Sequence, residues 1–518
     1  MLLRSLRRRP ESGFTGIHKL PGIDDLFSYL VILSLIITSS CATVETSPIS
    51  ARRPSTVELS SCNLPKHKEA ALCGKHQVYE NRSAKSGRVI ALNLVVLPAY
   101  SSEPKAEAVF YLTGGPGQGA ARIAGAGEDA IMRELRRERD LVFVDMRGTG
   151  DSNGLQCDFP IDRRHVQSLF GELFDPAVIQ LCREKLERIA DLKFYNSSLA
   201  IDDLDDIRLA LGYNKINLYG ISHGSQAALE YLRRYPDHVR SAVLTGVATP
   251  AMKIPLQFAR GADQAMAKLF NDCAGDESCN AAFPNLQAKF AQLLRSFDSG
   301  TINFQVLHPS SKVMQSVTLA RGVFAVRLLT LLYSHRTVSL LPLILDHASQ
   351  GNWRPFVQVI SRSAAPGEFR VYLGAYLSAT CSGSLPFIDE AEVARATAGT
   401  FMGAYRTRRH KQACAHWPRG EIDAEYFQPV QAVTPVLMLS GDIDPATPAE
   451  FGAQALTTLP NGRQVSLRNT PHSYTSPCAR SLIVEFIASG SAKELDARCA
   501  ARLRRPPFAT ELPARYNR

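Results

Sequence analysis

Short apolar runs alternate along the chain with longer segments in which apolar residues recur every three or four positions. Runs of four or five residues that are apolar on both faces are typical of buried strands in a parallel sheet. Two β-rich runs come first, at His76–Tyr79 and Arg88–Leu97. The buried-strand candidates that follow are Ala108–Leu112, Leu141–Asp145, Ile216–Tyr219, Ser241–Leu244, Pro435–Leu439 and Arg463–Leu467. Amphipathic helices such as Ala200–Leu211 and Ser225–Tyr235 lie between them, so the pattern predicts an α/β protein with a mostly parallel central sheet.

The alternation stops between residues 251 and 428, where the pattern is mostly helical. The helical stretches are Ala262–Phe270, Asn285–Phe297, Ala320–Tyr333 and Ile388–Tyr405. Because this segment lies between two strand candidates, we interpret it as a helical cap inserted over the carboxyl edge of the sheet. The predicted domains are a signal segment at 1–41, a tether at 42–60, a core at 61–250, the cap at 251–428 and the rest of the core at 429–518.

The first 41 residues have the composition of an export signal. The apolar stretch Leu26–Thr38 has 13 residues, which suits a signal peptide and is short for a membrane span of about 20 residues. Thr38-Ser39-Ser40-Cys41 resembles a bacterial lipobox, in which Cys41 is lipidated and becomes the first residue. The alternative is an ordinary signal peptide cut near Cys41. We therefore expect an exported protein, either a periplasmic or cell-envelope lipoprotein anchored in the membrane or a secreted protein.

The chain has 11 cysteines, and setting Cys41 aside leaves an even number. An even count in an exported chain favours disulfides. Pairing in sequence order is the simplest connectivity because each pair closes a short loop. The pairs are Cys62–Cys73, Cys157–Cys182, Cys273–Cys279, Cys381–Cys414 and Cys478–Cys499. A metal site is the competing interpretation of one cluster, and its spacing fits no standard zinc pattern: Cys62, His67, Cys73 and His76.

Charge and composition exclude one broad class of function. The chain has 518 residues, is 45% hydrophobic and carries a net charge of +10. Its arginines are scattered or terminal, and no basic stretch is interleaved with aromatic residues. We therefore expect no nucleic-acid partner.

The motif Gly220-Ile221-Ser222-His223-Gly224 follows a strand candidate and precedes a helix candidate. This is the context that a G-x-S-x-G nucleophile elbow requires, because the glycines permit a sharp turn that exposes the serine Oγ. The alternative is that Ser222 has a purely structural role as a helix N-cap. We predict that Ser222 is a nucleophile.

A serine nucleophile needs a base, and the base needs an acid that orients it. Asp442 and Asp444 both lie just past a strand candidate, and Asp444 is the better candidate because it opens the loop Asp-Pro-Ala-Thr-Pro. His472 is the one histidine that follows the acid in the chain, and histidine suits proton transfer near neutral pH. We predict the triad Ser222, Asp444 and His472.

Acyl transfer also requires donors for the oxyanion. The backbone N–H of His223 is one candidate. The second should come from Gly114-Gly115-Pro116-Gly117, with Gly115 preferred over Gly114. Gly148-Thr149-Gly150 lacks the third glycine of a dinucleotide loop. No cofactor is expected.

Together these motifs resemble the prolyl and tripeptidyl aminopeptidases, the TAP-like family of α/β-hydrolases among the clan SC serine peptidases. The resemblance runs from about residue 85 to the C-terminus, and its landmarks include GGPG at 114–117, DMRGTGDS at 145–152, NLYGISHGSQ at 217–226 and PVLMLSGDIDPATP at 435–448. It implies an α/β-hydrolase fold and an exported exopeptidase that acts through Ser222, Asp444 and His472.

The sequence departs from the family just after Cys381, where members often carry an acid that holds the amino group of the substrate. Here the residues are Ser382-Gly383-Ser384. The nearby acids Asp389, Glu390 and Glu392 are the candidate replacements.

Three functions therefore stay open. The first is an exopeptidase that releases residues or short peptides from peptide N-termini. The second is a carboxylesterase with the same triad, which the missing acid favours. The third is a non-catalytic binding lipoprotein, against which the complete Ser/Asp/His set argues.

Overall fold

The computed structural model describes residues 57–67, 69–157, 162, 164–363 and 371–517. The predicted signal segment with Cys41, and residues 42–56 of the predicted tether, lie outside the described residues. The first strand begins at Leu59, inside the predicted tether. Among the described residues, none of the helices is long and apolar enough to cross a membrane.

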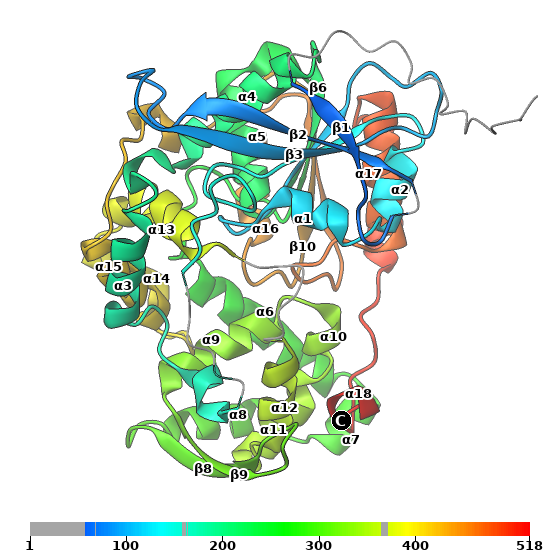
Figure 1. The fold of residues 1–518 in the computed structure, drawn as a ribbon. Coiled ribbons are helices and arrows are strands. Elements are labelled where there is room, and N and C mark those ends of the chain that lie inside the picture. The colour runs from blue at the N-terminus through cyan, green and yellow to red at the C-terminus, as the bar shows by residue number, and fades with distance from the viewer. Residues whose placement is uncertain (1–56, 68, 158–161, 163, 364–370, 518) are drawn as a thin grey trace, which may run out of the picture. The chain divides into compact units, whose positions relative to one another are not determined.

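Nine strands form one mixed sheet in the order β1-β2-β3-β5-β4-β6-β7-β10-β11 (Figure 1). The pairs from β1 to β5 are antiparallel, and every pair from β5 to β11 is parallel. The order reverses at β4, and this topology confirms the predicted α/β-hydrolase fold. The strands are Leu59–Cys62 (β1), Ala71–Tyr79 (β2), Val89–Leu97 (β3), Val109–Leu112 (β4), Leu141–Val144 (β5), Ile216–Ile221 (β6), Val239–Thr245 (β7), Val436–Gly441 (β10) and Gly462–Leu467 (β11).

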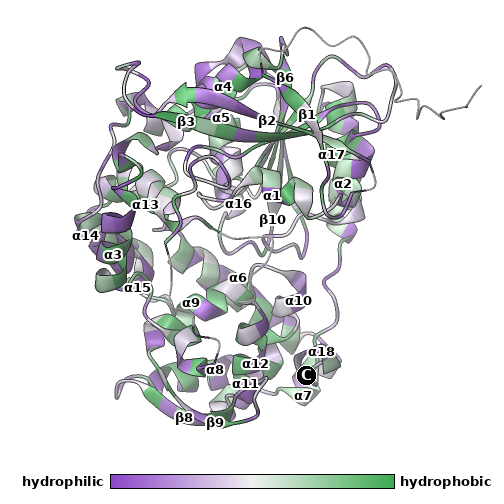
Figure 2. Cartoon of the chain, in the orientation of Figure 1, coloured by the Kyte–Doolittle hydropathy of each residue, from purple (hydrophilic) through white to green (hydrophobic). Residues whose placement is uncertain are grey.

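Helices cover both faces of the sheet because successive strand residues point to opposite sides. Phe110 packs into one core, and its neighbours Val109 and Tyr111 pack into the other. One face is covered by Ala120–Gly125 (α1), Ala130–Leu135 (α2) and Pro477–Ser489 (α17). The other is covered by Pro176–Leu186 (α3), Ser197–Ala210 (α4), His223–Arg234 (α5) and Leu373–Ser382 (α13). These helices carry both hydrophobic and hydrophilic residues (Figure 2), as expected for one buried side.

The chain between β7 and β10 is mostly helical and has a core of its own, built around Phe324, Trp353 and Phe356. Its helices, with the short helix after β10, are Phe258–Ala274 (α6), Glu277–Ala282 (α7), Leu286–Arg295 (α8), Arg321–Leu331 (α9), His335–Val338 (α10), Leu341–Ser349 (α11), Arg354–Ser363 (α12), Glu390–Thr397 (α14), Tyr405–Ala415 (α15) and Ala449–Leu456 (α16).

Two features of this segment differ from the prediction. Ile302–Leu307 (β8) and Met314–Leu319 (β9) form an antiparallel hairpin that was not predicted. The predicted helix Ile388–Tyr405 is wrong as one element, because α14 ends at Thr397. Gly399 and Gly403 follow with φ of +72° and +54°, and these left-handed conformations stop the helix.

The segment does not pack only with itself. Leu373 and Cys414, from α13 and α15, belong to the core of the sheet. The C-terminal residues Phe508 and Tyr516, the latter in Ala514–Asn517 (α18), belong to the core of the helical segment. The domain boundaries at 250 and 428 therefore stay predictions.

All ten cysteines among the described residues form disulfides, in sequence order. The bonds are Cys62–Cys73, Cys157–Cys182, Cys273–Cys279, Cys381–Cys414 and Cys478–Cys499. Among these residues there is also no group of side chains suited to holding a metal ion. Such a density of disulfides is typical of proteins outside the cytoplasm.

Candidate active site

Ser222 occupies a sharp turn between β6 and α5. Its φ of +58° and ψ of −123° are rare for a residue with a side chain. Two glycines make this turn possible. A Cβ at Gly220 would lie 2.4 Å from the carbonyl oxygen of Gly224, and one at Gly224 would lie 2.1 Å from that of Leu112. Strain and close backbone packing of this kind are what a nucleophile elbow requires.

His472 and Asp444 are directly paired. They follow β11 and β10, and Nδ1 of His472 lies 2.7 Å from Oδ2 of Asp444. Both side chains are buried. Because a carboxylate accepts, this contact fixes Nδ1 as the protonated nitrogen and leaves Nε2 as the acceptor. The alternative acid, Asp442, instead accepts from the backbone N–H of Thr470.

Asp444 is held by several donors besides the histidine. Its Oδ1 accepts from the backbone N–H groups of Ala446 and Thr447, and its Oδ2 accepts from the hydroxyls of Thr447 and Tyr474. Burial alone would raise the pKa of Asp444, but the His472 imidazole and these hydrogen bonds lower the pKa below its usual value. The carboxylate is therefore charged throughout the pH range in which His472 could act as a base.

Ser222 and His472 both lie over the end of β7. The N–H of Ser222 donates to the carbonyl of Thr245 at 2.9 Å. The next residue, Gly246, lies so close to the histidine that an added Cβ would stand 2.9 Å from its Cε1. The three candidate triad residues therefore gather at the carboxyl edge of the parallel strands, where such sheets bind ligands.

The glycine-rich loop after β4 packs on the nucleophile. A Cβ at Gly114 would stand 3.0 Å from the Cβ of Ser222. Gly115 has a φ of +115°, which favours glycine. His223 is the first residue of α5, so its backbone N–H has no partner within the helix. Both N–H groups proposed for the oxyanion, those of Gly115 and His223, thus belong to segments that flank Ser222.

The helical segment reaches this loop. The N–H of Tyr372 donates to the carbonyl of Gly117 at 2.8 Å, and Gln118 forms a β-bridge with Val371. A pocket beside the loop is lined by Gly114, Gly117, His223 and residues of α13. The start of α13 therefore forms one wall next to the nucleophile.

Sequence reasoning missed two tyrosines at this site. Tyr333, just after α9, packs its ring edge-on against His472 with 4.9 Å between ring centroids. Tyr474 donates to Asp444 and accepts from the N–H of Gly441 at 3.0 Å. The position of Tyr474, two residues after His472, was a signal that could have been used. Tyr333 gave none, because it is far from the motifs in sequence.

The three candidate amine-binding acids have partners elsewhere. Asp389 caps α14 by accepting from the N–H of Glu392. Glu390 pairs with Lys411, and Glu392 pairs with Lys253 at 2.7 Å. A substrate ammonium would have to displace a lysine from either glutamate. Their proposed role gains no support from this arrangement and stays a prediction.

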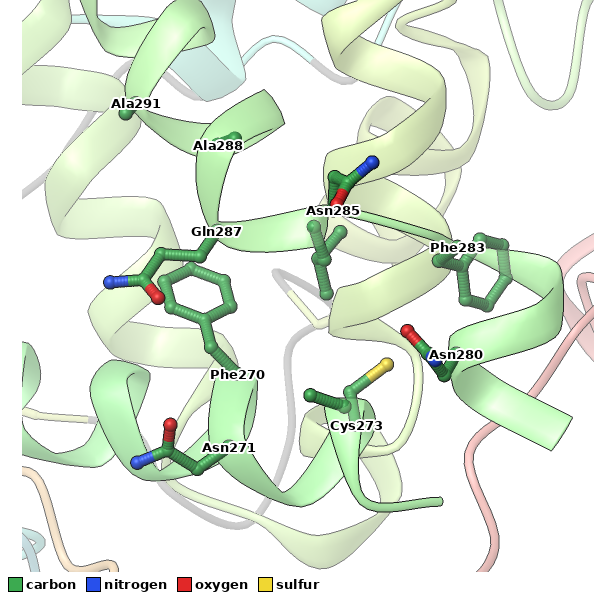
Figure 3. Close-up of a pocket in the computed structure, with 11 residues that line it drawn as sticks. Phe270, Asn271, Cys273, Asn280, Phe283, Asn285, Gln287, Ala288 and Ala291 are labelled. Carbon is green, nitrogen blue, oxygen red and sulfur yellow. The ribbon is translucent and has the colours of Figure 1, made fainter. Parts of the chain in front are cut away.

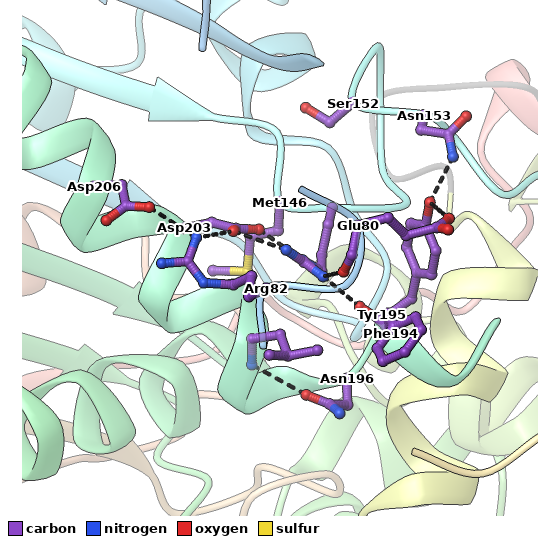
Figure 4. Close-up of polar contacts among 12 residues, drawn as sticks. Glu80, Arg82, Met146, Ser152, Asn153, Phe194, Tyr195, Asn196, Asp203 and Asp206 are labelled. Carbon is purple, nitrogen blue, oxygen red and sulfur yellow. Dashed lines mark hydrogen bonds and ion pairs between the residues drawn. The ribbon is translucent and has the colours of Figure 1, made fainter. Parts of the chain in front are cut away.

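A buried ion-pair network braces the loop after β5 (Figure 4). Arg147 donates to both oxygens of Asp203 at 2.6 and 2.8 Å, and also to the carbonyls of Glu80 and Phe194. Arg82 approaches the same Asp203 from the other side at 2.9 Å. Arg147 therefore joins the loop after β5 to α4 and to the residue that follows β2.

Another pocket lies within the helical segment, between α6, α7 and α8 (Figure 3). Phe270, Cys273 and Phe283 contribute to its lining, and no triad candidate does. It is therefore separate from the candidate active site.

The chain is similar in sequence to several known proteins. Residues 399–499 match the family model described as "TAP-like protein". The chain is 23% identical over 470 residues to the serine protease Hip1 of Mycobacterium tuberculosis, covering 83% of this chain and 87% of that protein. It is 30% identical over 155 residues to the tripeptidyl aminopeptidase of Streptomyces lividans, covering 28% and 29% of the two chains. A crystal structure of a proline iminopeptidase from Mycobacterium smegmatis aligns with a TM-score of 0.38 at 16% identity, covering 80% of this chain and 98% of that one.

Proposed function

We propose, from the premise that this chain belongs to the TAP-like family of α/β-hydrolases and is a serine hydrolase, that it is an exported exopeptidase. It would remove single residues or short peptides from the N-termini of peptides. The observation that carries the proposal is the pair formed by His472 and Asp444 at 2.7 Å, beside the strained turn of Ser222.

In the proposed mechanism, Oγ of Ser222 attacks the substrate carbonyl while Nε2 of His472 takes the hydroxyl proton. Asp444 holds the imidazole in the required tautomer and stabilises its positive charge. The N–H groups of Gly115 and His223 bind the oxyanion. The C–N bond then breaks as His472 returns the proton to the leaving amine, and water releases the acyl group from Ser222 by the same steps.

Two observations support an exopeptidase. The helical segment contacts the glycine-rich loop through Val371 and Tyr372, which favours short substrates over folded proteins. The relatives that match include a serine protease and a tripeptidyl aminopeptidase.

A carboxylesterase is the second candidate. It needs the same triad and no acid for a substrate amino group. The ion pairs of Glu390 and Glu392 favour the esterase, because carboxylates already paired with lysines are poorly suited to binding a substrate ammonium.

The deciding experiment compares free-amino and N-blocked peptidyl aminomethylcoumarins with a short-chain nitrophenyl ester. The Ser222→Ala variant serves as the negative control for background hydrolysis. Turnover that requires the free amine supports the exopeptidase. Turnover of the ester alone, or equal turnover of blocked and free peptides, contradicts it and favours the esterase.

Export is proposed on the signal-like N-terminus and on five disulfides. Lipidation at Cys41 is tested by labelling cells with an alkyne fatty acid, with Cys41→Ala as the control. Label on the wild type alone supports an anchor. Equal lack of label with protein in the medium supports plain secretion, and protein retained in the cytoplasm contradicts export.

A further inference from the structure

One charged side chain of the helical segment, that of Arg406, contacts residues that pack near the candidate acid and base. Arg406 lies in the first turn of α15, and its guanidinium carbon stands 4.0 Å from the centre of the Phe258 ring. Phe258 begins α6, and this helix packs against the loop that holds Asp444, since a Cβ at Gly261 would lie 2.4 Å from the carbonyl oxygen of Pro445. Arg406 is therefore tied to the loop of the catalytic acid through α6.

Tyr333 connects Arg406 with the candidate base, His472. Burial raises the pKa of the Tyr333 phenol to about 12, and the guanidinium of Arg406 acts against this rise while the charge of Asp444 adds to it. Tyr333 thus interacts with Arg406, and its ring contacts His472. Burial likewise raises the pKa of the Tyr376 phenol, and Arg406 acts against this rise too. Phe258, Tyr333 and Tyr376 surround the guanidinium with aromatic side chains.

Arg406 has no acidic partner among the residues that the structure describes. Two other cations of the same helix do have partners, since Arg409 pairs with Glu172 and Lys411 pairs with Glu390. The Nε atom of Arg406 is buried and makes no hydrogen bond within the described chain. His410, whose Nδ1 donates to the carbonyl of Arg406, has a pKa lowered to about 3 by burial and by Arg406, so it remains neutral. A buried donor without a partner is costly and requires an explanation.

A substrate carboxylate supplies that explanation. A guanidinium binds a carboxylate through two parallel hydrogen bonds, and Arg406, whose guanidinium also contacts the phenols of Tyr333 and Tyr376, keeps its Nε–H as an unused donor. The positive charge of Arg406 is opposite in sign to that of an acid that would bind a substrate ammonium.

We propose that Arg406 is the carboxylate-recognition residue of this hydrolase, and that the preferred substrates carry a carboxylate within one or two residues of the bond that Ser222 attacks. The carboxylate has two sources, an acidic side chain or the free C-terminus of a short peptide. This inference rests on the proposed hydrolase function and specifies its substrate class.

The first test measures ratios of kcat/KM for matched substrate pairs. One arm compares Glu with Gln at each position of tripeptidyl aminomethylcoumarins. The other compares short peptides ending in a free acid with the same peptides ending in an amide. Wild-type protein should prefer the carboxylate in one arm by roughly 10- to 100-fold, the effect of a hydrogen bond to a charged group.

Arg406→Met should reduce that ratio to about one, and Arg406→Lys should retain part of it, because lysine keeps the charge and loses the paired geometry. Arg408→Met is the matched control, since Arg408 is exposed two residues away on the same helix. It should keep the wild-type ratio. Turnover of neutral substrates with no carboxylate preference in either arm overturns the inference while the hydrolase function stands.

A binding measurement makes the test independent of turnover and of the variant's folding. Melting temperatures are recorded for wild type and for Arg406→Met with and without excess N-acetylglutamate or glutarate, after circular dichroism has compared the unliganded proteins. Stabilisation of the wild type alone supports the subsite even if no substrate is hydrolysed, in which case the proposed function fails by itself. Absence of stabilisation, or an equal shift in Arg406→Met, overturns the subsite.

Discussion

The phenol of Tyr474 donates a hydrogen bond of 2.7 Å to Oδ2 of Asp444, the same oxygen that faces His472. Tyr474 also accepts from the backbone N–H of Gly441, at the end of β10. It therefore fixes the carboxylate relative to the strand that carries it. A group that touches the acid and not the substrate is a positioning residue.

Tyr474→Phe should lower kcat roughly tenfold, because one hydrogen bond to the charged acid is lost and the imidazole is held less firmly. KM should change little. The unpaired N–H of Gly441 should also lower the melting temperature. Steady-state kinetics and thermal unfolding measure both effects, and Tyr79→Phe, at an exposed tyrosine, is the control. An unchanged kcat in Tyr474→Phe would show that Asp444 needs no such support.

Ser222→Ala should lower turnover by roughly 10³-fold or more and abolish labelling by a fluorophosphonate probe. The substitution removes only the hydroxyl, and the glycines that form the turn remain, so the fold should persist. Activity and labelling are measured beside the circular dichroism spectrum. Ser299→Ala, at an exposed serine, should behave as wild type. Wild-type rates in folded Ser222→Ala would falsify the mechanism.

Two buried histidines predict how stability depends on pH. Burial lowers the pKa of His223 to about 4, and burial together with Arg406 lowers that of His410 to about 3. His410 donates through Nδ1 to the carbonyl of Arg406, and its Nε2 accepts from the phenol of Tyr376 at 2.7 Å. The folded protein therefore holds both rings neutral.

Below the ordinary pKa of 6.5, the unfolded chain binds protons that the folded chain does not. The free energy of unfolding should therefore be highest above about pH 6.5 and should decrease as the pH drops toward 4. Each histidine should lower the free energy of unfolding by about 2–3 kcal/mol over the first two pH units below 6.5. Denaturant unfolding at several pH values tests this. His410→Gln should flatten the curve, and His416→Gln, at an exposed site, should not.

Much of the sheet could be predicted because its strands are short, apolar and flanked by helical patterns. The predicted run Ile216–Tyr219 is found within β6, which ends directly before Ser222. The hairpin of β8 and β9 was missed although its residues alternate in burial, since one exposed face weakened the hydrophobic signal. The break after α14 depends on two glycine conformations that periodicity does not reveal.

The site was only partly predictable for a related reason. Ser222 and His472 follow strands and lie in recognisable loops, so chain order selected them. Tyr333 reaches His472 from the turn after α9, and tertiary packing brings it there, of which single-sequence patterns carry no record. The proposed roles of Asp389, Glu390 and Glu392 came from proximity in sequence, and their lysine partners could be seen only in three dimensions.

The disulfide between Cys381 and Cys414 joins α13 to α15, the helix that carries Arg406, and it spans 33 residues of sequence. The bond between Cys273 and Cys279 spans only 6. A crosslink stabilises mainly by restricting the unfolded chain, and its effect grows with the logarithm of the loop length. The expected contributions are about 4 and about 2 kcal/mol.

Removing the longer loop as Cys381→Ala/Cys414→Ala should therefore lower the free energy of unfolding by about 1.5 kcal/mol more than Cys273→Ala/Cys279→Ala. Denaturant unfolding of the two double variants measures the difference. The first variant should also lose part of the carboxylate preference, because α15 is no longer tied to the wall formed by α13. Equal stability of the two variants would contradict the loop-length argument. An unchanged substrate ratio would show that packing against the sheet core alone keeps Arg406 in position.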